Sequence, residues 1–281
     1  MIWIISNEAE ECGIFTTFEQ YKKAFDEGEM DIYCARQDDD FSFIKADDVV
    51  IIRTRDKRIY ENLMLAQSKT KFKSTLESMG TLELTYDKEL LKSVLEKEHL
   101  QFPQTIAVLE NEKSYFVKPK YGEDSIGVDE MSKCNGVEDV SKKFESLLSK
   151  GLTPIVEEYI DGMEVTTAII NNQEDNPQVY SAFVKPNNNF GFHTSETKRN
   201  YDFTPHRCSD ENLKEICLKA FKAIGATHYI RIDSRICNGV PYIIDINMIA
   251  GLNRKGYMAK CLEVNGVDYF DFIRMVVKSA K

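Results

Sequence analysis

The sequence predicts an α+β protein in which a small N-terminal α/β domain precedes a larger region of mixed helices and antiparallel strands. The run at 49–53 is short and β-branched, as in a buried parallel strand. Within 71–102, leucine and valine side chains recur at helical spacing. Near the C-terminus, Asn238-Gly239 separates two alternating runs, which is a strong signal of a β-hairpin. With 281 residues, the chain is long enough for two or three domains.

The first 70 residues indicate two strands with a helix between them. Residues 2–5 form an apolar run, 18–27 carry aromatic side chains at helical spacing, and 49–53 complete the unit. The helical stretch within 71–102 contains Asp87, which suits a helix N-cap. This stretch ends before Pro103, because proline cannot continue a helix.

From residue 114 onward, the pattern changes to strands that alternate with helices. Strands are expected at 114–118, 155–159, 164–170, 229–236 and 242–247, and helices at 137–150, 210–224 and 269–277. The stretch 186–201 is long and polar and contains three consecutive asparagines. Loops of this length are often lids, so we expect a lid there.

The composition argues against several classes of protein. Lys and Arg total 36 against 46 Asp and Glu, a net charge of -10, and no basic block appears, which disfavours nucleic acid or an anionic membrane as a partner. The seven cysteines form no C-x-x-C pair, so neither a disulfide framework nor a zinc site is expected. The apolar start is too short for a signal peptide, and no run approaches the ~18 residues of a membrane span. We expect a cytoplasmic protein.

The predicted hairpin carries an unusual set of charges. Arg231, Asp233 and Arg235 share one face of the first strand, and Asp245 and Asn247 share one face of the second. If Asp233 lies opposite Asp245, the hairpin needs an odd-numbered loop or a bulge, and we predict a three-residue turn. Two carboxylates and an amide oxygen suit Mg²⁺. The alternative is a solvated face with an Arg–Asp pair.

Two further segments suit a nucleotide. Lys118 ends a strand, and a glycine-bounded loop follows at 122–127, whose backbone N–H groups could cradle a phosphate. Val128-Asp129 stands where a Walker A motif needs Lys-Ser/Thr, so this is not a P-loop, and an ordinary turn is about as plausible. The segment 154–164 ends a buried strand in acidic residues that could contact adenine and ribose, although it is also consistent with a plain polar strand exit.

The order of these motifs resembles the ATP-grasp superfamily. Lys88 precedes a helix, Lys118 precedes the glycine loop, an acidic strand exit follows, and Asp233 is followed by Asp245-Ile-Asn247. The resemblance covers about 86–255 and is to the D-alanine–D-alanine ligase-like and ribosomal-protein-modification-type carboxylate–amine ligases. It implies the ATP-grasp fold: an N-terminal domain at 1–72, a central lobe at 73–152 and a C-terminal lobe at 153–281, with ATP between the lobes.

The resemblance also implies roles for particular residues. Phosphate-binding groups would be Lys88, Lys118 and the loop 122–127 with Ser125. Adenine would be lined by Glu157, Glu158 and Ile160, and ribose held by Glu164. Asp233, Asp245 and Asn247 would bind Mg²⁺ or Mn²⁺. Lys198 or Arg199 would reach the γ-phosphate, and Arg231 with the Gly251 N–H would stabilise an oxyanion.

The activity implied by the resemblance is ATP-dependent formation of an amide or peptide bond through an acyl phosphate. The substrates would be amino acids or a peptide, and a homodimer is plausible. The alternative is an ATP-binding regulatory or interaction protein of the same fold.

The sequence departs from the family pattern at several positions. Asp245 stands where the family usually has Glu, Met248-Ile-Ala250 replaces a small-and-proline sequence, and Glu123-Asp124 makes the glycine loop acidic. The N-terminal domain lacks a glycine-rich, histidine-bearing signature, and Arg53 and Arg55 could bind a substrate carboxylate or form surface ion pairs.

Overall fold

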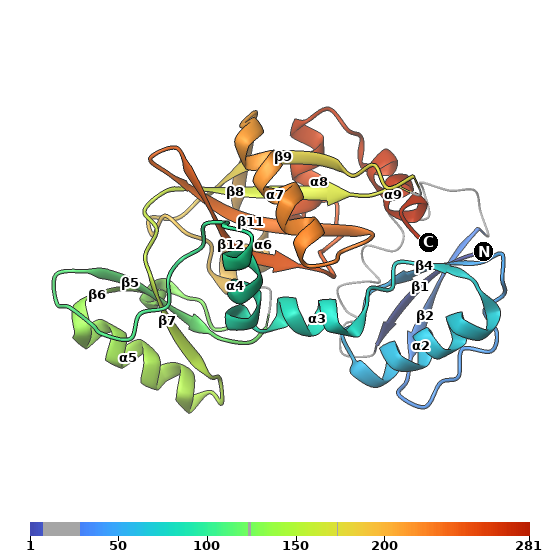
Figure 1. Cartoon of the computed structure of the whole chain (residues 1–281), viewed down its shortest axis with the longest axis horizontal. Coiled ribbons are helices and arrows are strands. Elements are labelled where there is room, and N and C mark those ends of the chain that lie inside the picture. Colours follow the sequence, from blue (N-terminus) through green and yellow to red (C-terminus); the bar gives the residue numbers. More distant parts are fainter. Residues whose placement is uncertain (8–28, 123–124, 173) are drawn as a thin grey trace.

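A computed structural model describes residues 1–7, 29–122, 125–172 and 174–281. Within these residues the strands form three sheets, which Figure 1 shows along the long axis of the molecule. The N-terminal sheet lies at one end, a small sheet covered by a helix lies at the other, and the largest sheet lies between them. The predicted mixture of helices and strands is confirmed, and the predicted helix at 18–27 falls outside the described residues.

The N-terminal sheet is parallel and has the strand order β2-β1-β3-β4. Its strands are β1 (Ile2–Asn7), β2 (Met30–Ala35), β3 (Val49–Ile52) and β4 (Lys73–Ser74), and the helix α2 (Lys57–Thr70) packs on it. The apolar runs predicted at 2–5 and 49–53 are therefore strands. The backbone of Lys281 exchanges two hydrogen bonds with Ser74, which fixes the C-terminal end of the chain against β4.

Two helices connect this domain to the rest of the molecule. They are α3 (Met79–Tyr86) and α4 (Lys88–Lys97). The Asp87 carboxylate accepts hydrogen bonds from the backbone N–H groups of Glu89 and Leu90, at 2.9 and 3.2 Å, and so caps α4 as the sequence predicts. The predicted helical region 71–102 thus contains a short strand and two helices.

The small sheet forms a separate lobe with the order β6-β5-β7. Its elements are β5 (Ser114–Pro119), the 3₁₀ turn η2 (Glu130–Ser132), β6 (Lys133–Asn135), the helix α5 (Gly136–Ser149) and β7 (Pro154–Glu158). The strand β7 begins just after the predicted boundary at 152/153 and pairs with β5. The division of the chain at that point stays a prediction.

The largest sheet is antiparallel and has the order β10-β9-β8-β11-β12. Its strands are β8 (Met163–Ile170), β9 (Gln178–Pro186), β10 (Phe203–Arg207), β11 (Tyr229–Cys237) and β12 (Val240–Asn247). The helices of this region are α6 (Ser195–Asn200), α7 (Glu211–Ala223), α8 (Tyr257–Val264) and α9 (Tyr269–Lys278). The polar stretch 186–201 is therefore not all loop, because α6 lies within it.

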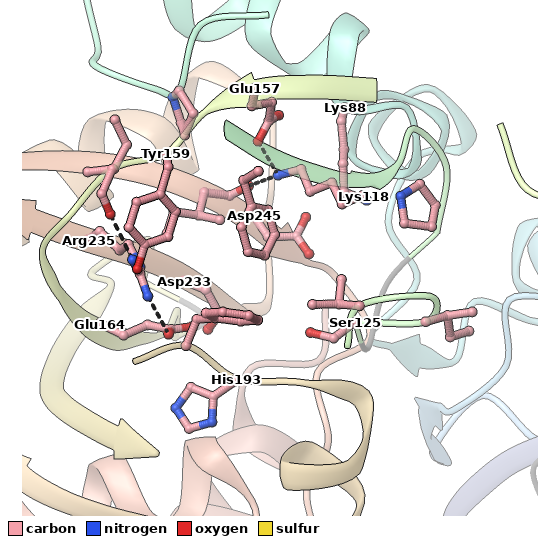
Figure 2. A pocket seen from close by; sticks show the side chains of 18 of the residues that line it. Lys88, Lys118, Ser125, Glu157, Tyr159, Glu164, His193, Asp233, Arg235 and Asp245 are labelled. Atoms are coloured by element: carbon pink, nitrogen blue, oxygen red, sulfur yellow. Dashed lines mark hydrogen bonds and ion pairs between the residues drawn. The ribbon is translucent and has the colours of Figure 1, made fainter. Parts of the chain in front are cut away.

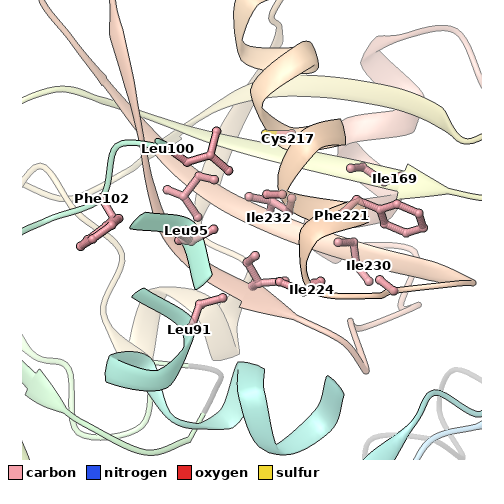
Figure 3. Packing of buried hydrophobic residues seen from close by; sticks show 14 of the residues in the cluster. Leu91, Leu95, Leu100, Phe102, Ile169, Cys217, Phe221, Ile224, Ile230 and Ile232 are labelled. Carbon is pink, nitrogen blue, oxygen red and sulfur yellow. The ribbon is translucent and has the colours of Figure 1, made fainter. Parts of the chain in front are cut away.

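Helices cover both faces of this sheet, and side-chain alternation along the strands explains why. Ile230 and Ile232 of β11 and Ile169 of β8 face α4 and α7, as Figure 3 shows. On the opposite face, Ala168 and Ile170 pack against α8 and α9. The N-terminal sheet joins this second core through Ile4 and Ile51 among others. Among the described residues, no helix combines the length and apolar content needed to cross a bilayer.

The β11–β12 hairpin confirms the predicted pairing and corrects the predicted turn. Asp233 lies directly opposite Asp245. Cys237 pairs with Val240, so the turn contains only Asn238 and Gly239, both at positive φ. The opposition arises from a register shift next to Asp233, where Ile244 is the extra residue of β12. The prediction of a three-residue turn was wrong, and a bulge serves the same purpose.

Candidate functional site

A pocket lies between the small lobe and the large sheet, and it collects most of the predicted site residues (Figure 2). Its lining includes Lys88, Lys118, Ser125, Glu157, Glu158, Ile160, Glu164, Lys198, Asp233 and Asp245. The other predicted residues do not line it: Arg231, Asn247, Gly251 and Arg199, the alternative to Lys198. Arg231 and Asn247 contact Asp233. The acidic pair Glu123-Asp124 lies outside the described residues.

One side of the pocket contains a buried carboxylate between two lysines. Glu157, at the end of β7, pairs with Lys118 Nζ at 2.8 Å and with Lys92 Nζ at 2.6 Å. Burial opposes the charged form, but the two ammonium groups outweigh it and hold the pKa of Glu157 below its usual value. This group of three carries one anion and two cations. Its surplus positive charge suits an anionic ligand.

The loop at 122–127 is held by lysines on both sides. Lys88 Nζ donates to the Gly122 carbonyl at 2.6 Å. Lys143, fully buried on α5, donates to the Gly127 carbonyl at 2.8 Å and pairs with Asp129 at 2.6 Å. Gly127 has φ +77°, and an added Cβ would lie 2.9 Å from Pro119 Cγ, so both backbone conformation and space require glycine here.

The predicted lid contacts this loop directly. The Ser195 hydroxyl, at the start of α6, donates to the carbonyls of Ser125 and Val128. The Ser195 backbone N–H also donates to the Val128 carbonyl, at 2.9 Å. The segment 186–201 therefore closes against the glycine loop at one edge of the pocket. Such a cover can exclude water from a reaction beneath it.

A buried arginine that sequence analysis left without a role joins three parts of the pocket wall. The Arg235 guanidinium donates to the carbonyls of Ile160 at 2.7 Å and Gly191 at 2.5 Å, and it lies 3.5 Å from a Glu164 carboxylate oxygen. It also stacks over the Tyr159 ring, 5.1 Å from the centroid. Arg235 thus connects the strand exit after β7, the start of β8 and the predicted lid (Figure 2).

The opposite side of the pocket contains a second buried carboxylate between cations. Asp233 receives both arms of Arg231, each at 3.0 Å, and pairs with Lys198 Nζ at 3.3 Å. Thr166 Oγ1 donates to the same carboxylate at 2.8 Å. Burial opposes ionisation, but Arg231 and Lys198 outweigh it and hold the pKa of Asp233 well below its usual range.

Oxygen atoms next to Asp233 could hold a cation. Asp245 faces Asp233 across the hairpin and lines the pocket. Asn247 Oδ1 is buried and has no hydrogen-bond partner in the described part of the chain, while Asn247 Nδ2 lies 3.4 Å from Asp233. The described residues include no cluster of three or more His, Cys, Asp or Glu of the kind that holds a metal. Two facing carboxylates and one amide oxygen are ligand types that suit a hard cation, and the assignment of a metal to them stays a prediction.

Tyr257 and His193 pack behind the cations that pair with Asp233. The Tyr257 ring, at the start of α8, lies 5.3 Å from the Arg231 guanidinium and 5.7 Å from Lys198 Nζ. His193 Nδ1 lies 2.7 Å from the Tyr257 hydroxyl, and His193 Nε2 lies 2.9 Å from the Val184 carbonyl. Burial lowers the pKa of His193 below its ordinary value, so the ring is neutral at pH 7.

Arg53 and Arg55 lie at the segment that follows the hairpin. Arg53 donates to the Ala250 carbonyl at 2.7 Å, and Arg55 lies 3.4 Å from the Ile249 carbonyl. Both of these contacts are to backbone oxygens, where the sequence suggested a substrate carboxylate or surface ion pairs. Gly251 follows directly, and its predicted role at an oxyanion depends on how this backbone is held.

Sequence reasoning missed Lys92, Arg235, His193 and Tyr257. For Lys92 and Arg235, the sequence did contain a local signal. Lys92 stands four positions after Lys88 in a predicted helix and so shares its face. Arg235 alternates with Arg231 and Asp233 on one face of a strand. For His193 and Tyr257 no local signal exists, because their contact joins residues 64 positions apart.

The sequence is similar to that of known D-alanine–D-alanine ligases. The family model "D-ala D-ala ligase C-terminus" matches residues 88–278. The D-alanine–D-alanine ligase of Maridesulfovibrio salexigens is 28% identical over 174 residues, which cover 59% of this chain and 55% of that protein. The ligase of Francisella tularensis subsp. novicida is 27% identical over 224 residues, covering 74% and 72%. The match therefore spans about half the length of the first relative.

Solved structures of similar fold cover nearly the whole chain. The D-alanine–D-alanine ligase from Bacillus anthracis complexed with ATP has a TM-score of 0.73 at 16% identity and covers 99% of this chain and 96% of that one. The VanG D-Ala:D-Ser ligase from Enterococcus faecalis has a TM-score of 0.72 at 14% identity and covers 98% of each chain. At these identities the likeness shows the fold, and it confirms the α+β class and the ATP-grasp architecture expected from the sequence.

Proposed function

Because the chain belongs to the D-ala D-ala ligase C-terminus family, we propose that it is an ATP-dependent carboxylate–amine ligase that joins amino acids through a peptide bond. One observation carries the proposal. One pocket is lined both by Lys88 and Lys118 and by a hairpin in which Asp233 faces Asp245. Lys92 does not line the pocket but pairs with Glu157, the partner of Lys118. A nucleotide triphosphate and a divalent cation need these two kinds of surface next to each other.

The nucleotide would lie along the small lobe. Lys88 and Lys118 would contact its phosphates, and the loop with Ser125 would cover them. Glu157, Glu158 and Ile160 would line adenine at the exit of β7, and Glu164 would accept hydrogen bonds from ribose. The support for this placement is that all of these residues line one pocket and that Arg235 orients the Glu164 carboxylate.

A divalent cation would be held by Asp233, Asp245 and Asn247. The unpartnered Asn247 Oδ1 and the facing carboxylates fit a hard cation, Mg²⁺ or Mn²⁺. When bound, such an ion would neutralise negative charge on the phosphates. Asp233 is already paired with Arg231, so we expect its position to be fixed before a ligand arrives. Asp245 would be the carboxylate that responds to occupancy.

The chemistry would proceed in two steps. An oxygen of the substrate carboxylate attacks the γ-phosphorus and releases ADP, which yields an acyl phosphate. A neutral amine then attacks the acyl carbon, the C–O bond to phosphate breaks, and the nitrogen loses a proton as the amide forms. Lys198 would neutralise charge at the γ-phosphate, and Arg231 with the Gly251 N–H would face the developing oxyanion. The 186–201 segment would exclude water, which would otherwise hydrolyse the intermediate.

We propose D-amino acids as the substrates, since the relatives are named for D-alanine and D-serine. The test incubates the full chain with ATP, Mg²⁺ and D-alanine, alone and with D-serine, and uses L-alanine as the matched control. We expect ADP and a condensed dipeptide in equal amounts with the D-enantiomers and background release with L-alanine. ATP binding without a condensed product from any D-amino acid would contradict this substrate class. Absence of ATP binding would contradict the nucleotide site itself.

A further inference from the structure

The backbone that follows the hairpin is held by side chains from distant parts of the chain. Each of three donors contacts one carbonyl group of this short segment: Arg55 at Ile249, Arg53 at Ala250, and the Tyr269 hydroxyl at Leu252. The segment has no regular secondary structure, so its own backbone does not fix it. Its conformation therefore depends on these contacts.

Arg53 makes the shortest of the three contacts and comes from the N-terminal domain. It follows directly after β3, and its own backbone N–H donates to the Ile5 carbonyl at 2.8 Å, which anchors it to the parallel sheet. Its guanidinium reaches the Ala250 carbonyl at 2.7 Å, 197 positions away in the sequence. A second contact to the Tyr229 hydroxyl, at 3.3 Å, limits rotation of the guanidinium. A charged donor at this distance makes a strong hydrogen bond.

The Ala250 carbonyl belongs to the same peptide unit as the Gly251 N–H. A peptide unit is planar and trans, so its N–H points opposite to its C=O. Fixing the carbonyl oxygen therefore fixes the direction of the N–H. A hydrogen bond accepted by the oxygen also polarises the unit and strengthens the N–H as a donor. Within the described residues, no group accepts a hydrogen bond from this N–H.

Neither backbone strain nor close packing requires a glycine at position 251. Its φ is not in the left-handed region, and an added Cβ would meet nothing within 4 Å. Open space therefore lies at the Cα of Gly251, next to a peptide whose orientation is set from its carbonyl side. A ligand that approaches this peptide would find a pre-oriented donor and no side chain at residue 251 in its way.

We propose that Arg53 is a positioning residue that aims the Gly251 N–H at the oxygen of the tetrahedral intermediate. When the amine adds to the acyl carbon, the C=O electron pair moves to this oxygen, and it returns as the phosphate leaves. Arg53 does not touch the reacting atoms. It acts through the Ala250–Gly251 peptide, and this role rests on the proposed ligase function. The N-terminal domain thereby takes part in the chemistry of the C-terminal lobe.

The first test does not depend on turnover. The full chain is labelled with ¹⁵N-glycine, and the Gly251 amide peak is identified by its loss in Gly251→Ala. In Arg53→Met we expect this peak to shift more than any other glycine peak and its amide proton to exchange faster with solvent. Arg58→Met is the matched control, because it removes an exposed arginine at the start of α2 that lies outside the three contacts to this segment. An unmoved Gly251 peak in folded Arg53→Met overturns the proposal.

Arg53→Lys covers the case in which the methionine variant does not fold. It retains the charge but not the planar pair of contacts to Ala250 and Tyr229. We expect an intermediate shift of the Gly251 peak in this variant. A shift that spreads evenly over the glycines of the central and C-terminal lobes would indicate general loosening and would overturn the proposal.

The second test measures dipeptide formation from D-alanine and ATP. Arg53→Met should lower kcat about 10- to 100-fold, somewhat less than the ~10²–10³-fold cost of removing an oxyanion donor outright. The dissociation constant for ATP should stay unchanged. An equal loss of ATP affinity would mean that Arg53 only holds the domains together, against the proposal. If the wild type forms no dipeptide, the proposed function fails, while the Gly251 peak still decides whether Arg53 orients this peptide.

Discussion

The two sides of the pocket both contain a buried carboxylate between two cations, but they differ in what surrounds it. Glu157 has Lys92 and Lys118 as partners. Asp233 has Arg231 and Lys198, and it also has a second carboxylate, Asp245, directly across the hairpin. The first group carries a net positive charge, whereas the second is balanced and adds oxygen ligands. The same local motif thus suits an anion on one wall and a cation on the other.

The difference shows which residues are structural and which can respond to a ligand. Each buried carboxylate compensates charges that would otherwise be costly to bury. Asp245 and Asn247 are not needed for that compensation, and Asn247 Oδ1 has no partner in the part of the chain that is described. We therefore expect variants at the two buried carboxylates to affect folding and variants at Asp245 to affect function.

The largest effect should come from removing either buried carboxylate. Asp233→Asn and Glu157→Gln each remove the carboxylate partner of one buried cation, Arg231 or Lys118, and of one partly buried lysine. We expect each variant to lose about 3–5 kcal/mol of unfolding free energy. Urea denaturation measures this loss, and Asp161→Asn, which changes an exposed aspartate outside the predicted site, serves as a control. A loss below about 1 kcal/mol in one variant would show that the two groups are not equivalent in folding.

Asp245→Asn should separate function from folding. Within the described residues, the Asp245 side chain accepts one hydrogen bond, a local one from the Ile246 N–H, which an asparagine oxygen can also accept. We expect turnover to fall about 100-fold, or ~2.7 kcal/mol in activation free energy. The free energy of unfolding should change by less than ~0.5 kcal/mol. An unchanged rate would contradict the assignment of Asp245 to a cation.

At low pH, protonation of Glu157 should lower the free energy of unfolding. The pKa of Glu157 is lower in the folded protein than in the unfolded chain. Its contribution to the free energy of unfolding is therefore fully present above the unfolded pKa of about 4.3 and is lost as the pH falls through the folded pKa. The stabilisation that is lost comes from the pairing of this carboxylate with Lys92 and Lys118. Urea midpoints measured below pH 5 should therefore fall less steeply for Glu157→Gln than for the wild type. Parallel slopes would contradict a lowered pKa.

The smallest effect should come from the predicted lid, whose helix α6 contacts both sides of the pocket. The helix α6 carries Lys198 toward Asp233 and Ser195 toward the glycine loop. Ser195→Ala removes the hydroxyl contacts but keeps the backbone contact to Val128, so we expect a two- to fivefold rise in KM for ATP, about 0.5–1 kcal/mol. Ser149→Ala, an exposed serine on α5, is the matched control and should leave KM unchanged.

Much of the fold and the pocket could be predicted because its signals are local. Alternation along the β11–β12 hairpin placed Asp233 and Asp245 on one face, and the spacing in α4 marked Lys88 and its helix. The turn was predicted wrongly because a bulge leaves no local signature, and sequence parity alone cannot tell an extra strand residue from an extra loop residue. Burial shows the difference: Ile243 and Ile246 enter the core, while Ile244 lines the pocket.

Contacts between distant segments could not be predicted in this way. The helix α6 forms in a polar stretch because Thr194 and Thr197 cap each other reciprocally, and a threonine at the second position is a weaker pattern than the usual Glu or Gln. The contacts of Arg235 to Gly191 and of Arg53 to Ala250 join positions 44 and 197 residues apart. Arginine in a strand or at its end looks like a surface residue until the tertiary structure provides its acceptors.

The reach of Arg53 into the C-terminal lobe limits how freely the N-terminal domain could be exchanged. A chimera that replaced residues 1–72 with another small α/β domain would form its own sheet and could still pack on α8 and α9. It would keep the nucleotide pocket intact, since the predicted nucleotide-binding residues begin at Lys88. Without an arginine at the end of its third strand, such a hybrid would bind ATP yet lack the support for the Ala250–Gly251 peptide. Domain exchange in this architecture would therefore have to preserve the side-chain contacts that residues 1–72 make to this segment.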